Sequence, residues 1–213
     1  MAGGLRLTSW LQRPGRAWVT LAAVLALGAA LAWRLPAAGL DWQPARAVAQ
    51  PWRAWTAAFV HWSALHLAVN LFAAAVVGAF GHAARVPARA ALAWFAAWPL
   101  THLALALQPA LTPYGGLSGV LHAGVALVAV WLVVTGPGAR RLIGAAVLAG
   151  LVTKLVLERP FGPALRAEAG WDIAVAPLAH FTGSLAGAAC AAVALAWHRS
   201  PHPRGHRPRQ SGA

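Results

Sequence analysis

The sequence predicts an all-α membrane protein with six transmembrane helices in a bundle. Sixty per cent of the residues are hydrophobic, only 10% are charged and the mean hydropathy is +0.61. Soluble domains carry about 25% charged residues, so this composition is typical of a membrane protein. The apolar residues form six runs, each close to the roughly 20 residues that cross about 30 Å of hydrocarbon as a helix.

The predicted spans cover residues 17–33, 61–80, 88–107, 117–135, 142–157 and 177–197. The first run has the competing interpretation of a signal peptide, because a basic segment precedes it and small residues follow Pro36. It is long for the apolar region of a signal peptide and long enough to cross a bilayer, so we favour a retained span. The loop before the second span is rich in tryptophan and is expected to lie against the outer bilayer surface.

The domain organisation is a core at 17–197 between two basic ends. Residues 1–16 form an N-terminal tail, and the tail at 198–213 is rich in arginine, histidine and proline and is expected to be disordered. Eleven of the 17 basic residues fall on the side of the termini and all four acidic residues fall on the other side. The positive-inside rule therefore predicts cytoplasmic termini.

The net charge of +13 raises the alternative of a nucleic-acid-binding protein. The basic residues flank apolar spans and form no stripe with interleaved aromatic residues, so we expect no nucleic-acid partner and expect the lipid bilayer instead. The single cysteine, Cys190, excludes an intrachain disulfide and a cysteine-based metal site. The excess of arginine over lysine and the frequent alanine indicate a GC-rich bacterial gene.

The stretch Tyr114–Ala123 places Ser118 between Gly116 and Gly119 where a loop gives way to an apolar run. A serine hydroxyl needs a base within hydrogen-bond reach to act as a nucleophile. Glycine has no Cβ, so other groups can approach the hydroxyl closely. Alone, the pattern fits a capped helix start more readily than a catalytic serine.

Polar residues gather near the starts of spans two, four and six, all of which begin at the outer face in this topology. They are His61, His66, Asn70, Ser118, His122 and His180. Polar residues inside a span are energetically expensive and usually functional. Three helices with such residues at one depth indicate a common site.

Spans four and six carry complementary small residues. His180, Gly183 and Gly187 share one helical face, and Gly119 with Ala123 offers a matching face for close packing. That packing would bring His180 toward Ser118 as general base and later general acid. Because no Asp or Glu falls within the predicted spans, a Ser-His dyad without an orienting acid is expected.

The combined motifs resemble the rhomboid family of intramembrane serine proteases. They are Trp52-Arg53, His61, His66, Asn70, Gly116-x-Ser118-Gly119 and Ala179-His180-x-x-Gly183-x-x-x-Gly187, in that order over residues 52–187. The resemblance implies a six-helix core with Ser118 as nucleophile and His180 as base. It also implies that His66 and Asn70 stabilise the oxyanion together with backbone N–H groups, and that His61 lies nearby.

The stretch Gly116-Leu-Ser-Gly-Val-Leu-His122 is similar to the rhombosortase subgroup. This narrower resemblance implies single-span substrates with a C-terminal Gly-Gly sorting tail, cleaved at a site open to the periplasm from the bacterial inner membrane. Many rhomboids stack a span-five tyrosine on the catalytic histidine, and this chain has no tyrosine there. Phe161 or Trp171 is a candidate for that place. His122, one turn after Ser118, either supports the catalytic residues from behind or has no role in the site.

Two alternatives remain at this stage. A haem-binding membrane cytochrome could use a pair from His66, His102, His122 and His180 as axial ligands, but it leaves Ser118 and Asn70 unexplained. A catalytically inactive rhomboid-like scaffold is the other, although the serine and the histidine are both present. A zinc protease is not expected, since no His-Glu-x-x-His occurs, and neither a metal nor a cofactor is expected.

Overall fold

A computed structural model describes residue 9 and residues 13–199 of the chain. Over this part the structure has seven α-helices and no β-strand. They are α2 (Arg16–Ala32), α3 (Arg53–Thr56), α4 (Ala64–Ala83), α5 (Ala88–Leu103), α6 (Ser118–Thr135), α7 (Ala139–Glu158) and α8 (Pro177–Arg199). Short 3₁₀ turns are η1 (Pro44–Arg46), η2 (Ala57–Phe59) and η3 (Ala104–Leu107). The predicted tails lie outside the described residues, apart from residues 9, 13–16, 198 and 199.

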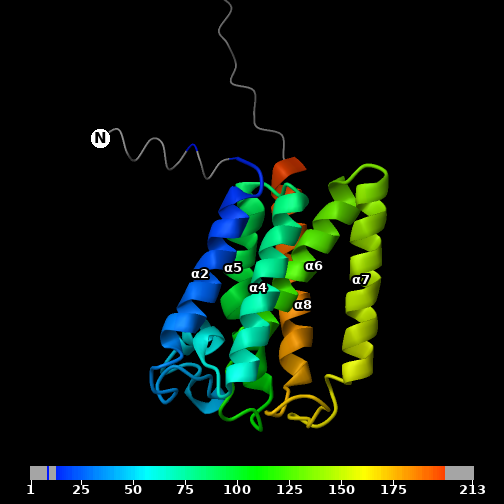
Figure 1. Cartoon of the computed structure of the whole chain (residues 1–213). Coiled ribbons are helices and arrows are strands. Elements are labelled where there is room, and N and C mark those ends of the chain that lie inside the picture. Colours follow the sequence, from blue (N-terminus) through cyan, green and yellow to red (C-terminus); the bar gives the residue numbers. More distant parts are fainter. Residues whose placement is uncertain (1–8, 10–12, 200–213) are drawn as a thin grey trace, which may run out of the picture.

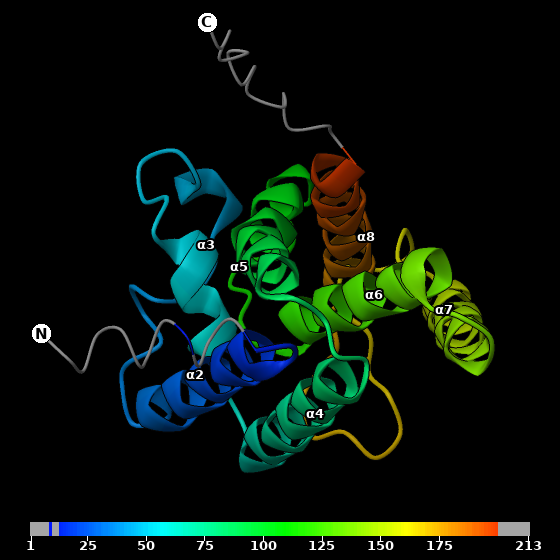
Figure 2. The same cartoon turned by 90° about the horizontal axis from the view of Figure 1, so that it is seen from above.

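The six long helices run up and down through one bundle (Figure 1). The start of α2 and the end of α8 lie at the same end, and the long connections lie at the opposite end. Seen along the bundle, α6 lies among α4, α5, α7 and α8, whereas α7 stands at the edge and packs mainly against α6 (Figure 2). The helix that begins with Ser118 is thus surrounded by helices that can bring side chains to it.

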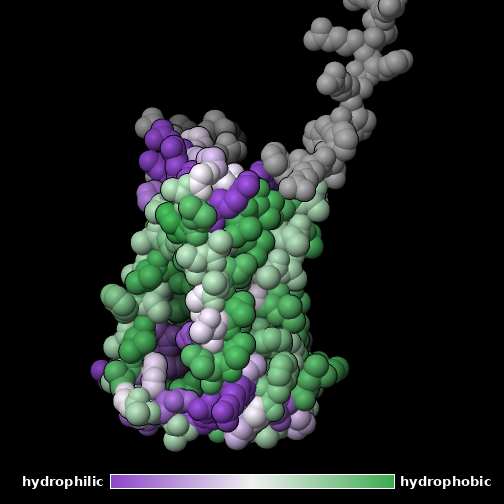
Figure 3. All heavy atoms as spheres, turned by 90° about the vertical axis from the view of Figure 1, so that its right-hand side faces the viewer, coloured by the Kyte–Doolittle hydropathy of each residue, from purple (hydrophilic) through white to green (hydrophobic). Residues whose placement is uncertain are grey.

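Each predicted span coincides with a long helix, and four of these helices are long and apolar enough to cross a membrane. They cover Ala64–Ala83, Ala88–Leu107, Ser118–Thr135 and Pro177–Trp197. Apolar side chains cover most of the face shown in Figure 3, between polar ends. The protein is therefore a multi-pass membrane protein. Helix α2 is shorter and α7 carries more charge, so it stays a prediction that these two helices also cross the membrane.

The second long helix begins at Ala64, and the predicted start at His61 is wrong. Ser63 has an extended backbone and its hydroxyl accepts a hydrogen bond from the backbone N–H of His66, 3.0 Å away. A serine in this conformation satisfies a free N–H of the first turn and marks the helix start. His61 consequently lies in the loop before α4.

Tryptophan side chains join the helices inside the core. The rings of Trp18 and Trp94 stack with their centroids 4.3 Å apart. Trp94 Nε1 donates a hydrogen bond to the Val120 carbonyl of α6 at 2.8 Å, and Trp18 Nε1 donates to the Val77 carbonyl of α4 at 2.9 Å. A buried indole needs such a partner for its N–H, so these two residues link α2, α4, α5 and α6.

The connection between α2 and α4 holds the segment that leads into Ser118. The buried side chains of Arg53 and Asp41 form an ion pair, and Arg53 Nη1 also donates to the Asp41 carbonyl at 2.6 Å. The next residue, Trp42, exchanges two backbone hydrogen bonds with Tyr114, at 2.7 and 2.9 Å. The loop thereby fixes the chain four residues before the serine.

Candidate active site

The backbones of α6 and α8 touch at four small residues, which we call the α6–α8 seam: Gly119 and Ala123 on α6 with Gly183 and Gly187 on α8. A Cβ placed on Gly183 would lie 2.0 Å from the Gly119 carbonyl oxygen, and one on Gly187 would lie 2.1 Å from the Ala123 carbonyl oxygen. No side chain fits at either place. The seam therefore sets the distance between the two helices through main-chain contact alone.

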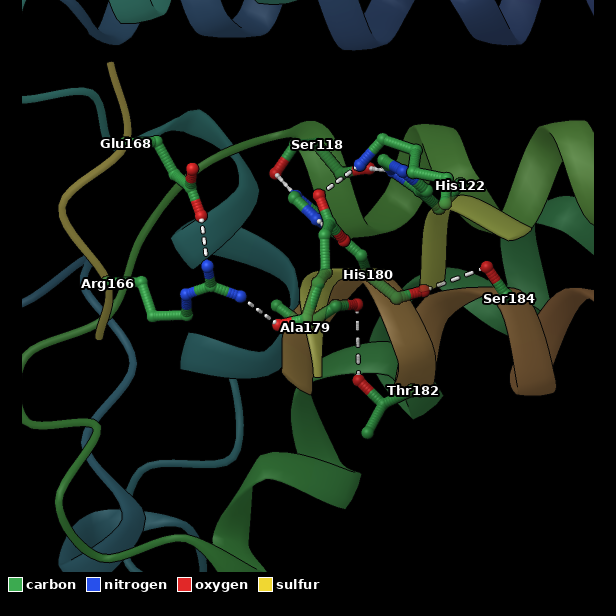
Figure 4. A network of polar contacts seen from close by, with 10 residues as sticks. Ser118, His122, Arg166, Glu168, Ala179, His180, Thr182 and Ser184 are labelled. Carbon is green, nitrogen blue, oxygen red and sulfur yellow. Dashed lines mark hydrogen bonds and ion pairs between the residues drawn. The ribbon is translucent and has the colours of Figure 1, made fainter. Parts of the chain in front are cut away.

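The seam brings Ser118 and His180 together at one end of α6 and α8. The Ser118 hydroxyl donates to His180 Nε2, with 3.0 Å between Oγ and Nε2 (Figure 4). Ser118 is half-buried at the first residue of α6, and His180 is buried in the first turn of α8. This distance suits proton transfer from a serine to an imidazole base.

The prediction that no acidic side chain orients the histidine is wrong. Glu158, the last residue of α7, places Oε2 2.8 Å from His180 Nδ1. The predicted fifth span ended at residue 157, which left Glu158 in a loop, whereas α7 continues one residue further and aims the carboxylate inward. The structure therefore joins serine, histidine and glutamate in one line.

His122 packs on His180. The rings of His122 and His180 are stacked with centroids 4.2 Å apart and planes 13° from parallel. His122 Nδ1 lies 2.7 Å from the Ser118 carbonyl and donates to it, which holds the ring over His180. The predicted candidates for this place are wrong. Phe161 packs on Phe181, and the Trp171 ring lies beside the His66 ring, with 6.3 Å between the two centroids.

His66 and Asn70 project from α4, and both are buried. A Cβ on Gly116 would lie 2.8 Å from His66 Cε1, so this imidazole rests against the backbone just before the serine. Gly116 has φ +133°, a backbone conformation that residues with a side chain rarely adopt. Both this conformation and the close contact with His66 therefore require a glycine. Asn70 Nδ2 donates to the His66 carbonyl at 3.0 Å and retains a second N–H.

His61 lies behind His66, with 4.7 Å between the ring centroids. Its Nδ1 lies 3.2 Å from the Phe59 carbonyl, to which it donates. Burial lowers the pKa of His61 from its usual value, so this ring stays neutral near pH 7. His61 does not line the cavity described next, and it can affect the site only through His66.

A cavity of about 520 Å³ opens beside the serine. Among the residues that line it are Ser118, His180, His122, His66, Asn70 and Tyr114. The connection 159–176 supplies further apolar lining, and its Asp172 Oδ1 accepts a hydrogen bond of 2.7 Å from Ser63 Oγ at the start of α4. The cavity therefore lies between α4, α6, α8 and a connection that is tied across it.

Sequence reasoning missed the roles of Glu158, Lys154 and Tyr114. Lys154 forms an ion pair with Glu158 one turn away and lines the cavity. A lysine and a glutamate four residues apart in an otherwise apolar run were the available signal, since charges near membrane depth are usually functional. The Tyr114 hydroxyl is buried beside the cavity and lies near Ser118.

The geometry does not favour the cytochrome. His122 and His180 are stacked too closely for a porphyrin to lie between them. His102 is fully buried, and its Nδ1 lies 2.6 Å from the Ala54 carbonyl. His102 does not line the cavity beside Ser118, so it does not face His66 across it.

One comparison with known proteins matches most of the chain. A model of the Rhomboid domain matches residues 48–197, which include all the residues gathered here. A search of curated proteins found no match.

Proposed function

We propose that this chain, which belongs to the rhomboid family, is an intramembrane serine endopeptidase with Ser118 as its nucleophile and His180 as its base. Members of the family are generally intramembrane serine proteases. The observation that carries the proposal for this chain is the hydrogen bond of 3.0 Å between Ser118 Oγ and His180 Nε2 beside a cavity. An inactive scaffold has no need of this contact.

In the proposed reaction Ser118 Oγ attacks the carbonyl carbon of the scissile peptide bond while its proton passes to His180 Nε2. The imidazolium then gives that proton to the leaving nitrogen as the C–N bond breaks, which leaves an ester on Ser118. Water attacks the ester and gives a proton to Nε2. The Oγ–C bond breaks, and the same proton returns to the serine.

The charge that develops on the carbonyl oxygen needs donors held in place in advance. Asn70 has a second amide N–H, and His66 lies against the Gly116 backbone beside the nucleophile. The backbone N–H groups at the start of α6 have no earlier turn to bond to. These groups together are the proposed oxyanion site, which agrees with the roles that the resemblance implies.

The proposed substrate is a single-span protein whose C-terminal sorting tail carries small residues where it meets the outer bilayer face. A helix hides its carbonyl groups, so the serine can attack only where the helix unwinds. Glycine in a helix is less favourable than alanine by about 1 kcal/mol, which makes a Gly-Gly pair easy to unwind. The apolar lining of the cavity supports a segment of this kind.

Labelling with a fluorophosphonate tests the nucleophile without knowledge of the substrate. The wild-type protein should be labelled and Ser118→Ala should not. Ser184→Ala is the matched control, because Ser184 is also a buried helix serine but its hydroxyl already donates to the His180 carbonyl at 2.8 Å. Labelling that survives in Ser118→Ala, or that disappears in Ser184→Ala, would contradict the proposal.

Two cellular experiments test the substrate and the location. Deletion of the gene should leave C-terminal Gly-Gly tails on cell-surface proteins, which mass spectrometry of C-terminal peptides detects; normal trimming would remove the narrower, rhombosortase-like assignment. For a bacterial inner-membrane protein whose site opens to the periplasm, a reporter inserted between Pro109 and Pro113 should report periplasm. A reporter fused after Ala213 should report cytoplasm, and the opposite pattern would contradict this location.

A further inference from the structure

Glu158 is the one carboxylate that reaches the catalytic pair among the described residues. His180 uses both of its ring nitrogens: Nδ1 faces Glu158 Oε2 at 2.8 Å and Nε2 faces Ser118 Oγ at 3.0 Å. A carboxylate only accepts hydrogen bonds, so Nδ1 must carry the proton in this arrangement. Nε2 is then the unprotonated nitrogen, which is the form that can take the serine proton.

Besides His180, two positively charged side chains contact Glu158. Its Oε1 pairs with the Lys154 ammonium, and its backbone carbonyl accepts a hydrogen bond of 2.7 Å from Arg166 Nη1. Arg166 is held in turn by Glu168, with 3.0 Å between Nη2 and Oε1 (Figure 4). The ammonium on one oxygen favours the ionised carboxylate, and the other oxygen is left for His180.

The Lys154–Glu158 ion pair differs from an ordinary surface ion pair in its surroundings. A solvent-exposed lysine–glutamate pair one turn apart contributes little to stability. Here the third partner, His180, has only 8% of its side chain exposed. Lys154 lies within an otherwise apolar helix, where an ammonium is costly without a nearby carboxylate.

Apart from the two hydrogen bonds of the ring itself, the contacts of the site do not fix the rotation of the His180 ring. The α6–α8 seam holds the backbone of the histidine, and His122 covers one ring face. Neither contact distinguishes the two nitrogens, whereas a hydrogen bond to Nδ1 does. Among the residues that the structure describes, Glu158 alone supplies that bond.

We infer that Glu158 is a positioning residue that acts through His180, and that Lys154 keeps its carboxylate ionised and in place. The inference rests on the proposed serine protease function. It turns the expected dyad into a line of three groups, Ser118, His180 and Glu158. Glu158 fixes the ring orientation and stabilises the imidazolium that forms during the reaction.

The test measures fluorophosphonate labelling of the purified full-length chain in lipid nanodiscs. Removing the orienting acid of soluble triads lowers kcat by about 10⁴-fold, and we expect a loss of roughly 10- to 10⁴-fold in the maximal labelling rate of Glu158→Gln. The probe concentration at half-maximal rate should stay unchanged, because Glu158 touches His180 and does not line the cavity. Glu158→Asp should recover part of the rate.

Two further variants separate a positioning role from a general charge effect. Glu168→Gln makes the same chemical change at a carboxylate that contacts Arg166 and not His180. It should lose much less of the labelling rate than Glu158→Gln, because it leaves the hydrogen bond to His180 in place. Lys154→Met should lose less than Glu158→Gln. Equal losses in Glu168→Gln and Glu158→Gln would overturn the inference.

An NMR measurement tests the hydrogen bond without any activity. With ¹⁵N-labelled histidine, the proton on His180 Nδ1 should resonate far downfield in the wild type and in Ser118→Ala. The resonance should be absent in Glu158→Gln and in His180→Ala. A wild type without Ser118-dependent labelling would contradict the proposed function, whereas Glu158→Gln with a wild-type rate and an unchanged resonance would overturn this inference alone.

Discussion

Two regions of the molecule deliver the proposed catalytic groups, and they do so by different physical means. At the α6–α8 seam, backbone meets backbone, and even a methyl group on Gly183 would collide with the Gly119 carbonyl. At the edge of the bundle, α7 reaches the site through the Glu158 side chain. The seam sets where the serine and the histidine stand, while α7 sets how the histidine ring is turned.

The difference predicts how each region responds to mutation. Backbone contact cannot be relieved by a rotamer change, so a substitution in the seam must move a helix. A side-chain contact can be removed without moving the helix that carries it. Seam variants should therefore lose stability together with activity, whereas variants of the Glu158 side chain on α7 should lose activity alone.

The largest effect is expected from the two residues that the seam brings together. Ser118→Ala and His180→Ala should each lower turnover by roughly 10⁶-fold, and the double variant should be no worse, because the members of such a unit act together. Cleavage of a reporter with a C-terminal Gly-Gly pair, an apolar span and a basic end measures this. Losses that multiply in the double variant would mean that the two residues act independently.

Asn70 lines the cavity from α4, and its effect should be the next largest. Loss of one oxyanion donor lowers kcat by about 10²- to 10³-fold, so Asn70→Ala should lower reporter cleavage by that factor. Fluorophosphonate labelling of Ser118 should persist, since the nucleophile and base are intact. Full cleavage activity would make Asn70 a packing residue and leave the oxyanion to His66 and the backbone.

Gly183→Ala tests the seam itself. The added methyl would lie 2.0 Å from the Gly119 carbonyl oxygen, and overpacking of this kind typically costs about 1–3 kcal/mol. A displacement of about 1 Å between Ser118 and His180 can also lower the rate by 10²-fold. We expect a lower unfolding temperature and slower cleavage together.

Gly150→Ala is the matched control for the seam variant. Gly150 lies on α7, and a Cβ there would meet nothing within 4 Å. Alanine is more favourable than glycine in a helix by about 1 kcal/mol, so this variant should be as stable as the wild type or slightly more stable. If Gly183→Ala behaved in the same way, main-chain contact would not be what positions the two helices.

The smallest effect is expected at the connection that follows α7. Asp172→Asn weakens the tie of 2.7 Å to Ser63, whereas Ser63→Ala removes the tie and the helix cap as well. Loss of a serine cap costs about 0.5–2 kcal/mol, so Ser63→Ala should lower the unfolding temperature more than Asp172→Asn. Both should speed amide hydrogen exchange in 159–176, and unchanged exchange would mean that the tie does not hold the connection.

Much of the fold could be predicted because its signals are local. Runs of apolar residues placed all six long helices, and the basic residues and glycines marked their ends. The start of α4 was missed by three residues because His61 and Trp62 continue the apolar and aromatic pattern, and only the backbone turn at Ser63 ends it. The polar residues near the helix starts marked Ser118 and His180 as candidates for one site.

The sequence by itself determined which groups can react: a serine in a glycine frame, a histidine on a small-residue face, and no acid inside the apolar core of a span. Only the tertiary structure decided that Glu158 faces His180 across 22 positions of the chain, and that His122 covers the same ring. Apolar helices have weak amphipathic patterns in a membrane, because lipid and protein interior are alike in polarity. The local sequence pattern therefore does not predict how each helix is rotated about its own axis. That rotation is set by contacts between helices, and those contacts choose which side chain meets the histidine.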